Sequence, residues 1–432
     1  MPPIRNAFEK VLVMAERDIS PPPTKRQRLS APSSLAPSIP SRHITPLSSD
    51  LLRVFSWNVN GIAPFLQPPI TSFFSKSPGG GKAKPGVSIN LSARKFEDKK
   101  RPSSNVHSSR LRDTTPEPVV AKEAPSLAAC LKRWKYPSVV CLQEVKISPS
   151  DTKTQQAVRQ AVKTCISKAN SDELDTGYTA HFNLPQDKFN AQGFGGKLYG
   201  VCTLVRNDLL SDEDVGSHVK MVDWDLEGRV LLLELPNKNV VVFNVYAVNG
   251  TDNPYRDPHT GIVIGTRHDR KREFHTELAG ECKQYEQRGW IVVVAGDLNI
   301  ARRPIDGFPG IRLGQAHVKN RADFERKIMS KNEGLGMLDS FRLLHGEERK
   351  YSYRPRGVEW GASCDRVDMI LISHQAGHVS DTSAHEKSKE GKTRWWDLVE
   401  ADMLDEELER GPSDHVPIYA TLAWRRPTSE QA

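Results

Sequence analysis

The stretch Trp290-Ile291-Val292-Val293-Val294-Ala295-Gly296-Asp297-Leu298-Asn299 decides the fold. Its run from Ile291 to Val294 is continuously apolar and β-branched, which is typical of a strand buried on both faces. Gly296 predicts a turn at the end of that strand, because glycine frees the backbone. Asp297 and Asn299 follow, and the alternation of side chains along a strand predicts that both point the same way. Such a pair can orient and deprotonate a water, whereas the alternative is a pair that only favours a turn.

Other apolar runs also have polar residues at their ends. We predict strands over 51–57, 138–142, 240–246, 366–372 and 418–422, and helices over 127–134 and 267–285. Each polar residue alone has another interpretation, such as an Asn-Gly turn at 60–61 or a surface ion pair between Glu144 and Lys146. The full set of polar residues at strand ends is Asn58, Asn60, Glu144, Tyr246, Asn249, Asp297, Asn299, Asp368, Asp414 and His415.

This set indicates a chemistry. Carboxylates, amides and one imidazole, without a cysteine ligand set, suit a hard cation such as Mg²⁺, with Mn²⁺ as the other candidate. A metal neutralises phosphate charge, a carboxylate activates water, and an imidazole stabilises or protonates oxygen. The residues therefore predict hydrolysis of a phosphodiester. The alternation of strands with helices predicts an α/β fold.

The positive charge of the chain lies in segments that we expect to be disordered. The net charge is +8 over 432 residues, of which residues 1–50 hold +3 and residues 67–123 hold +6, so the remainder carries −1. The mean hydropathy of −0.53 agrees with a partly unfolded chain. We therefore predict a basic tail over 1–50, a catalytic domain over 51–424 that is interrupted by an insertion over 67–123, and a short tail over 425–432.

Two short motifs lie in those segments. Lys25, Arg26 and Arg28 form a basic run that is typical of a nuclear import signal, and the alternative is a solvated charge cluster. Gln67, Ile70, Phe73 and Phe74 have the spacing Q-x-x-I-x-x-F-F, which resembles the binding box for the sliding clamp PCNA. Exposed aromatic residues in a disordered segment are anchors for a partner's groove, unless they pack on the protein's own surface.

Several classes are excluded or disfavoured by composition. No apolar run reaches membrane-spanning length, so we expect no membrane association. Glu9, Glu16 and Asp18 interrupt any secretory apolar segment. Six scattered cysteines without a CxxC pair indicate free thiols in a reducing compartment. The basic run at 267–272 and the pair at 302–303 make Arg267, Arg270 and Arg302 candidate phosphate contacts, although the first run also suits a solvated helix end.

The motifs resemble a known family. Ser56-Trp57-Asn58-Val59-Asn60-Gly61, Leu142-Gln143-Glu144-Val145-Lys146, Gly296-Asp297-Leu298-Asn299, Arg366-Val367-Asp368 and Ser413-Asp414-His415 look like the exonuclease III class of apurinic/apyrimidinic (AP) endonucleases. The resemblance covers residues 51–66 and 124–424, and the insertion resembles the fungal form of the second AP endonuclease (class II). It implies a four-layered α/β sandwich of two mixed sheets, as in DNase I-like phosphodiesterases.

The resemblance also implies roles. Glu144 would bind the metal with Asp414 and Asn60 nearby, although many members have Asp at position 60. Asp297 would activate the water, helped by Asn299, and His415, oriented by Asp368, would contact the scissile phosphate. We count Asp297, Asn299 and His415 as further candidate metal ligands. Residues expected to contact phosphate or DNA, or to order the site, are Tyr246, Asn58, Asn249 and Tyr353. Longer relatives carry a C-terminal zinc module, and we expect none here.

The expected activity is metal-dependent cleavage of DNA 5′ to abasic sites and removal of nucleotides or blocking groups from 3′ ends. Relatives that incise abasic sites strongly have an aromatic residue where this chain has Asp365, so we expect the 3′-end activities to be the faster ones. The expected partners are double-stranded DNA and PCNA, for a monomer in the nucleus. The alternatives are a phosphatase of inositol phosphates or lipids, and a non-enzymatic scaffold bound to the clamp.

Overall fold

The computed structural model describes residues 47, 50–66, 126–163, 177–191, 198–209, 218–374 and 396–424. The import run with Lys25, Arg26 and Arg28, the clamp motif with Gln67, Ile70, Phe73 and Phe74, and the tail over 425–432 lie outside the described residues. Within the part of the chain that is described, no helix combines the length and the apolar character that crossing a membrane requires.

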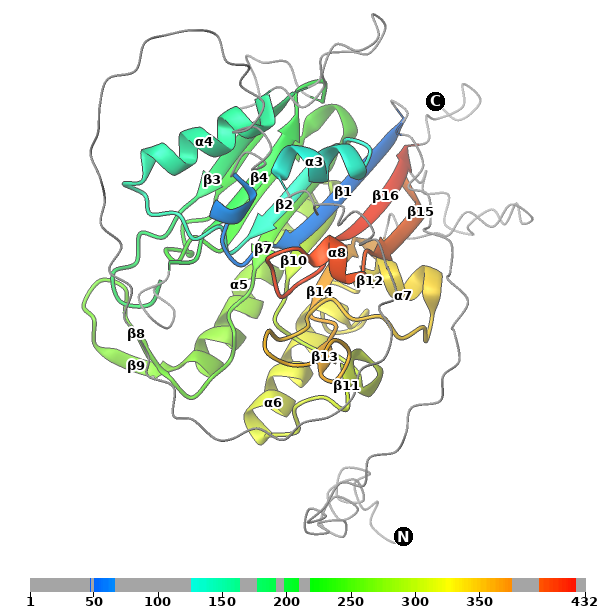
Figure 1. Ribbon diagram of the computed structural model, residues 1–432. Coiled ribbons are helices and arrows are strands. Elements are labelled where there is room, and N and C mark those ends of the chain that lie inside the picture. The colour runs from blue at the N-terminus through cyan, green and yellow to red at the C-terminus, as the bar shows by residue number, and fades with distance from the viewer. Residues whose placement is uncertain are drawn as a thin grey trace, which may run out of the picture. The chain divides into compact units, whose positions relative to one another are not determined.

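Two six-stranded mixed sheets form the centre of the structure (Figure 1). The first has the order β15 (Trp396–Met403), β16 (Ile418–Trp424), β1 (Leu51–Asn58), β2 (Val139–Gln143), β4 (Val201–Arg206) and β3 (Tyr178–Asn183). The second has the order β12 (Leu338–Asp339), β14 (Asp368–Ile372), β10 (Ile291–Asp297), β7 (Val240–Tyr246), β6 (Val230–Leu235) and β5 (Val219–Met221). The pairs β1–β2 and β7–β10 are parallel, whereas the other pairs in these sheets are antiparallel.

Helices cover the outer face of each sheet. α3 (Leu127–Arg133) and α4 (Thr152–Lys163) pack on the first sheet, and α5 (Arg267–Gln287) and α6 (Gln315–Phe324) pack on the second. The shorter elements are η1 (Ala63–Phe65), η4 (Pro236–Lys238), η5 (Pro304–Asp306), the π turn η6 (Glu325–Met329), α7 (Ser340–His345), α8 (Glu407–Arg410), and the strand pairs β8 (Pro254–Arg256) with β9 (Val263–Thr266) and β11 (Gly307–Phe308) with β13 (Cys364–Asp365). The expected four-layered α/β sandwich is confirmed.

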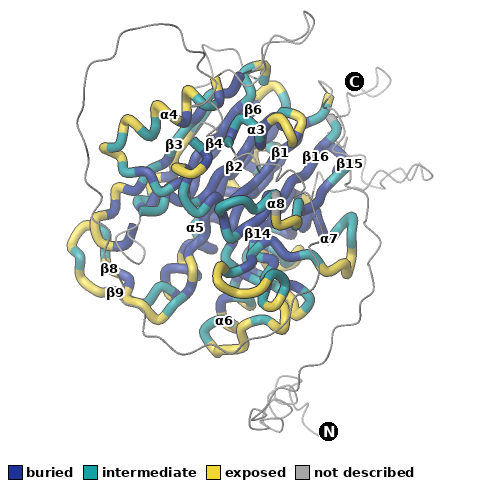
Figure 2. Tube along the Cα trace, viewed as in Figure 1, coloured by how far each residue is buried: buried dark blue, intermediate teal, exposed yellow. Residues whose placement is uncertain are grey.

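Strand β10 is buried on both faces, as its sequence predicts. Val293 and Ala295 point into the core between the two sheets, whereas Val292 and Val294 pack against the layer that contains α5. Figure 2 shows the central strands as buried and the outer turns of α4 as exposed. This double burial explains the continuous β-branched run.

The predicted turn at Gly296 is wrong. The strand continues through Gly296 to Asp297, and Gly296 lies beside Val245 of the parallel strand β7. A Cβ atom at position 296 would lie 1.8 Å from the carbonyl oxygen of Val245. Glycine is therefore required here for the close approach of two strands, not for a change of chain direction.

Candidate active site

The sheet register brings three polar side chains into one row. Asp297 at the end of β10 pairs with Tyr246 of β7 on one side and with Asp368 of β14 on the other. Asp297 has the same parity as Val293 and Ala295, so it faces the other sheet. Asn58, at the end of β1, faces it from there, and its Nδ2 donates to Asp297 Oδ2 at 3.0 Å. The facing strand ends therefore create a polar centre at the edge of an apolar core.

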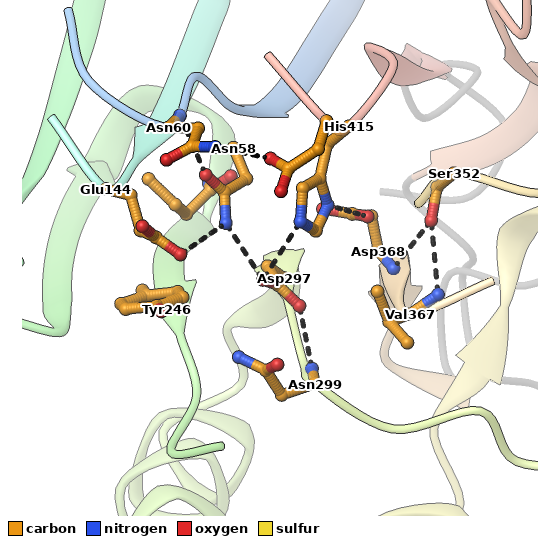
Figure 3. A network of polar contacts seen from close by, with 12 residues as sticks. Asn58, Asn60, Glu144, Tyr246, Asp297, Asn299, Ser352, Val367, Asp368 and His415 are labelled. Carbon is orange, nitrogen blue, oxygen red and sulfur yellow. Dashed lines mark hydrogen bonds and ion pairs between the residues drawn. The ribbon is translucent and has the colours of Figure 1, made fainter. Parts of the chain in front are cut away.

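Asn58 links the two carboxylates that the sequence singles out (Figure 3). Its Nδ2 also donates to Glu144 Oε1 at 3.1 Å, so one amide group bridges Glu144 and Asp297. Asn60 donates to Asp414 Oδ1 at 2.8 Å. The first sheet thus contributes the end of the site that contains Glu144, Asn60 and Asp414.

His415 and Asp368 form a buried pair. His415 Nδ1 lies 2.8 Å from Asp368 Oδ2, and His415 Nε2 lies 3.9 Å from Asp297 Oδ2. The backbone N–H groups of Val367 and Asp368 donate to Ser352 Oγ, which fixes the start of β14. A carboxylate on Nδ1 leaves Nε2 as the ring nitrogen that faces the site. The ring of Tyr353 lies beside this imidazole, with 4.9 Å between the centroids.

Strand alternation does not explain how Asn60 and Asn299 reach the site. Both residues lie beyond the strand ends in the left-handed region, with φ of 50° and 51°, and Glu144 and Lys146 have φ of 50° and 55°. Left-handed backbone is costly for Glu and Lys and clusters at functional sites. The backbone N–H of Asn299 donates to Asp297 Oδ1 at 2.8 Å. A turn, not a shared strand face, therefore joins Asn299 to Asp297.

The electrostatics of the site separate an acid from a base. Burial, together with the charge of Asp368, raises the pKa of Asp297 to about 7. Burial opposes the charged form of His415, but the charges of Asp368 and Asp297 outweigh it and raise the pKa of His415 to about 10. At neutral pH the imidazolium can donate a proton or a hydrogen bond, and Asp297 can accept a proton.

The Glu144 end of the site favours negative charge. Burial alone would raise the pKa of Glu144, but the charge of Lys146 and hydrogen bonds from Tyr246 and Asn58 outweigh it, so the pKa lies below its ordinary value. Burial and the charge of Glu144 raise the pKa of Tyr246 well above its ordinary value. Tyr246 therefore remains a neutral hydrogen-bond donor.

The donor set around Glu144 fits a hard divalent cation. The Lys146 ammonium contacts Glu144 Oε2 at 3.0 Å and also donates to Asn60 Oδ1, so a positive charge already bridges two of the predicted ligands. Asp297, Asp368 and His415 form a second group with ligand atoms within 4.8 Å of one another, but His415 Nδ1 is already bonded to Asp368. The oxygen donors Glu144, Asn60 and Asp414 are therefore the better candidate metal ligands.

A cleft of about 190 Å³ opens onto these side chains. Of the predicted residues, those that line it are Glu144, Tyr246, Asn249, Asp297, Asn299, Tyr353, Asp365, Asp414 and His415. Arg312, His317 and Arg321 also line it, and the sequence analysis missed them. They come from α6 and the loop before it, where no strand-end pattern marks them. Among the described residues neither Arg312 nor Arg321 forms a hydrogen bond or an ion pair with a carboxylate, and the charge of Arg312 acts on the Asp365 carboxylate in the same cleft. Both guanidinium groups are therefore available to an anion.

The predicted DNA contacts of three other arginines are not supported. Arg267 donates twice to Glu227, Arg270 pairs with Glu277, and Arg302 pairs with Glu325 and Asp339. None of the three lines the cleft. Their guanidinium groups are largely buried and neutralised within the fold, so they serve its internal charge balance.

The fold and the site define a hydrolase of phosphate esters. Residues 55–415 match the Endonuclease/Exonuclease/phosphatase family, and the chain belongs to this family. Its members typically depend on a divalent metal. A comparison with curated proteins found no match.

Two solved structures are similar to this chain. The catalytic domain of Xenopus laevis APE2 has a TM-score of 0.48 and 16% identity, over 87% of this chain and 92% of that chain. An AP endonuclease from Archaeoglobus fulgidus has a TM-score of 0.46 and 17% identity, over 85% of this chain and 98% of that chain.

Proposed function

We propose that this chain is a Mg²⁺- or Mn²⁺-dependent DNA phosphodiesterase of the AP endonuclease type, which acts beside abasic sites and at damaged 3′ ends. The observation that supports it best is one cleft in which Glu144, Asp297 and the His415–Asp368 pair meet two unpaired guanidinium groups, Arg312 and Arg321. A polyanion such as DNA has further phosphates beyond the scissile bond, and these can bind the two guanidinium groups. A small phosphate ester lacks such phosphates and needs these groups less.

The residues have separate tasks in this reaction. Glu144, Asn60 and Asp414 would hold the metal, which neutralises phosphate charge when bound. Asp297, held by Asn58 and by the backbone N–H of Asn299, takes the proton from the attacking water. His415 directs Nε2 toward the scissile phosphate while Asp368 fixes its ring. Tyr246 remains protonated and donates a hydrogen bond to a phosphate oxygen.

A gel assay tests this function. Duplexes with an internal abasic analogue, a recessed 3′ end or a blocked 3′ end are incubated with the full chain and Mg²⁺ or Mn²⁺. We expect metal-dependent cleavage of all three. Release of phosphate from a soluble inositol phosphate without cleavage of any duplex would overturn the proposal.

The side chain of Asp365 sets the expected order of these activities. Asp365 and Tyr353 both line the cleft. Burial raises the pKa of Asp365 and the charge of Arg312 offsets this only in part, which indicates that this wall is a poor environment for the carboxylate. A base-free sugar needs an apolar pocket, and a carboxylate there also repels nearby phosphates. We expect 3′-end removal to outpace abasic incision, and Asp365→Trp to shift the ratio about tenfold toward incision.

Initial rates on matched abasic and 3′-recessed duplexes measure that ratio. Asp365→Leu is the control, because it removes the charge without adding a ring. A ratio for Asp365→Leu between those of the wild type and Asp365→Trp would separate the effect of removing the charge from the effect of adding the ring. Faster abasic incision than 3′ removal by the wild type, at equal enzyme and metal, would contradict the pocket argument.

We also propose that the motif at 67–74 binds a PCNA-type sliding clamp, which would hold the enzyme at DNA. Aromatic anchors in desolvated pockets often contribute about 2 kcal/mol or more each. Phe73→Ala combined with Phe74→Ala should therefore abolish clamp binding in calorimetry and leave cleavage of short oligonucleotides unchanged. Phe96→Ala, in the same insertion but outside the motif, is the matched control. Equal clamp affinity for the wild type and the double variant would refute the motif.

The basic run at 25–28 supports a nuclear location, where a DNA substrate is found. Imaging of the tagged full chain tests this proposal, and an exclusively cytoplasmic signal would contradict it.

A further inference from the structure

Lys271 is a buried lysine of α5 that the proposed reaction does not use. Its side chain lies against the inner wall of the cleft, and the residue is only 1% exposed. The ammonium nitrogen donates to the carbonyl oxygens of Val248, Asn299 and Leu298 at 2.8, 3.1 and 3.2 Å. Among the described residues, these three oxygens have no other donor.

The three carbonyl groups belong to two loops that carry functional side chains. Val248 precedes Asn249 in the loop after β7, and Leu298 and Asn299 follow Asp297 at the end of β10. Carbonyl dipoles that converge on one point repel one another, and an ammonium group has three donors and no acceptor to match them. Burial lowers the pKa of Lys271 to about 7. The three acceptors favour the protonated form, because a neutral amine would turn its lone pair toward one of them.

Lys271 differs from the other cations of α5. Arg267 and Arg270 are held by Glu227 and Glu277, whereas Lys271, among the described residues, makes its hydrogen bonds to backbone carbonyl groups alone. Removing its ammonium would leave three buried or partly buried acceptors without a donor and would loosen the two loops, which would then be joined only by the hydrogen bonds between Asn299 Nδ2 and Ala247 O and between Ala247 N–H and Asp297 O among the described residues. The backbone of Asn299 also donates to Asp297 Oδ1, so movement of this loop is passed directly to the proposed base.

We infer that Lys271 is a positioning residue for phosphodiester hydrolysis, which ties the loops after β7 and β10 together and thereby fixes Asn249, Asn299 and the carboxylate of Asp297. This inference rests on the proposed function. It assigns to α5 a part in catalysis that acts mainly through the backbone, since Lys271 makes no hydrogen bond to Asp297 and is joined to it through Asn299, while the charges of Lys271 and Asp297 also attract each other.

Lys271→Met and Lys327→Met form a matched pair of variants. Lys327 also makes three hydrogen bonds, to Arg272 O, Thr276 Oγ1 and Asp323 Oδ2, but it joins α5 to η6 outside the cleft. Misplacement of catalytic groups by about 1 Å can cost about 10²-fold in rate, so we expect Lys271→Met to lower kcat about 10- to 100-fold with a change in KM of less than about threefold. Lys327→Met should keep kcat within about twofold.

Hydrogen exchange gives a readout that is independent of activity. Peptides covering 247–250 and 298–301 should exchange faster in Lys271→Met than in the wild type, and should be unchanged in Lys327→Met. Lys271→Arg keeps the charge but presents a planar set of donors, so its kcat should lie between those of Lys271→Met and the wild type. Lys271→Gln is neutral, and its kcat should be lower than that of Lys271→Arg.

Several outcomes would overturn the inference. These are a kcat of Lys271→Met within about twofold of the wild type, equal losses in both Met variants, or unchanged exchange in the two loops. If Lys271→Met does not fold, the other two variants decide. A higher kcat for Lys271→Arg than for Lys271→Gln supports the inference, and equal kcat values refute it. If the wild type cleaves no DNA, the proposed function fails, and the exchange data alone then decide whether Lys271 ties the loops.

Discussion

Glu144→Gln and Asp297→Asn should each lower phosphodiester hydrolysis at least about 10²-fold while the chain remains folded. Both changes are nearly isosteric and remove a charge from the cleft. Because burial raises the pKa of Asp297 to about 7, its ionisation lowers the stability of the fold progressively as pH rises from the ordinary carboxyl range to about 7, and a neutral amide removes this cost. The loss in Asp297→Asn is therefore a loss of the base. The loss of activity in Glu144→Gln is the loss of the anionic oxygen that would bind the metal. In this structure the Lys146 ammonium contacts that oxygen.

Initial rates on a 3′-recessed duplex, with folding checked by circular dichroism, measure both effects. Glu234→Gln is the matched control, because Glu234 is a mostly buried carboxylate bonded to Lys220 and Tyr285 and does not line the cleft. It should keep the rate within about twofold, since it alters only local packing and one ion pair. A near-normal rate for folded Glu144→Gln or Asp297→Asn would remove that residue from the proposed mechanism.

The strand ends of the site were predictable because burial imposes a local pattern. A strand covered on both faces needs a continuous apolar run, so Ile291–Val294 and Val240–Phe243 are visible in the sequence, and the polar residues that follow each run mark the sheet edge. The bounds of β7 agree with the prediction over Val240–Tyr246. The packing of two such sheets face to face was expected only from the resemblance to a family, since local pattern does not specify which strand ends meet.

The charged residues show what a linear pattern misses. Arg267 finds its partner Glu227 and Arg302 finds Asp339, which are 40 and 37 residues apart in the chain. Sequence spacing cannot identify such pairs, so these arginines look the same as free ones. Arg312 and Arg321 are the opposite case, because neither forms an ion pair with a carboxylate among the described residues and both line the cleft. Whether a cation contacts substrate or balances an internal charge is decided by tertiary structure.

Asp368→Asn should lower the rate at least about 10²-fold and should move the whole pH–rate curve to lower pH. Asp368 accepts from His415 Nδ1 at 2.8 Å, and a neutral amide at this position no longer stabilises the protonated imidazole that the reaction requires. The loss of the charge also changes two pKa values. Burial and Asp368 together raise the pKa of Asp297, and Asp368 is the largest of the charges that raise the pKa of His415, so both values fall in the variant.

The direction of the shift follows from the protonation state that each group needs. Asp297 must be ionised, so activity in the wild type rises as pH increases through about 7, and His415 must be protonated, so activity falls as pH increases through about 10. In Asp368→Asn both limbs of a kcat/KM profile should therefore lie at lower pH. Asp323→Asn is the matched control, because it breaks a second buried His–carboxylate pair, His275 with Asp323 at 3.0 Å, away from the cleft. An unchanged profile in Asp368→Asn, or an equal shift in Asp323→Asn, would contradict the role assigned to the His415–Asp368 pair.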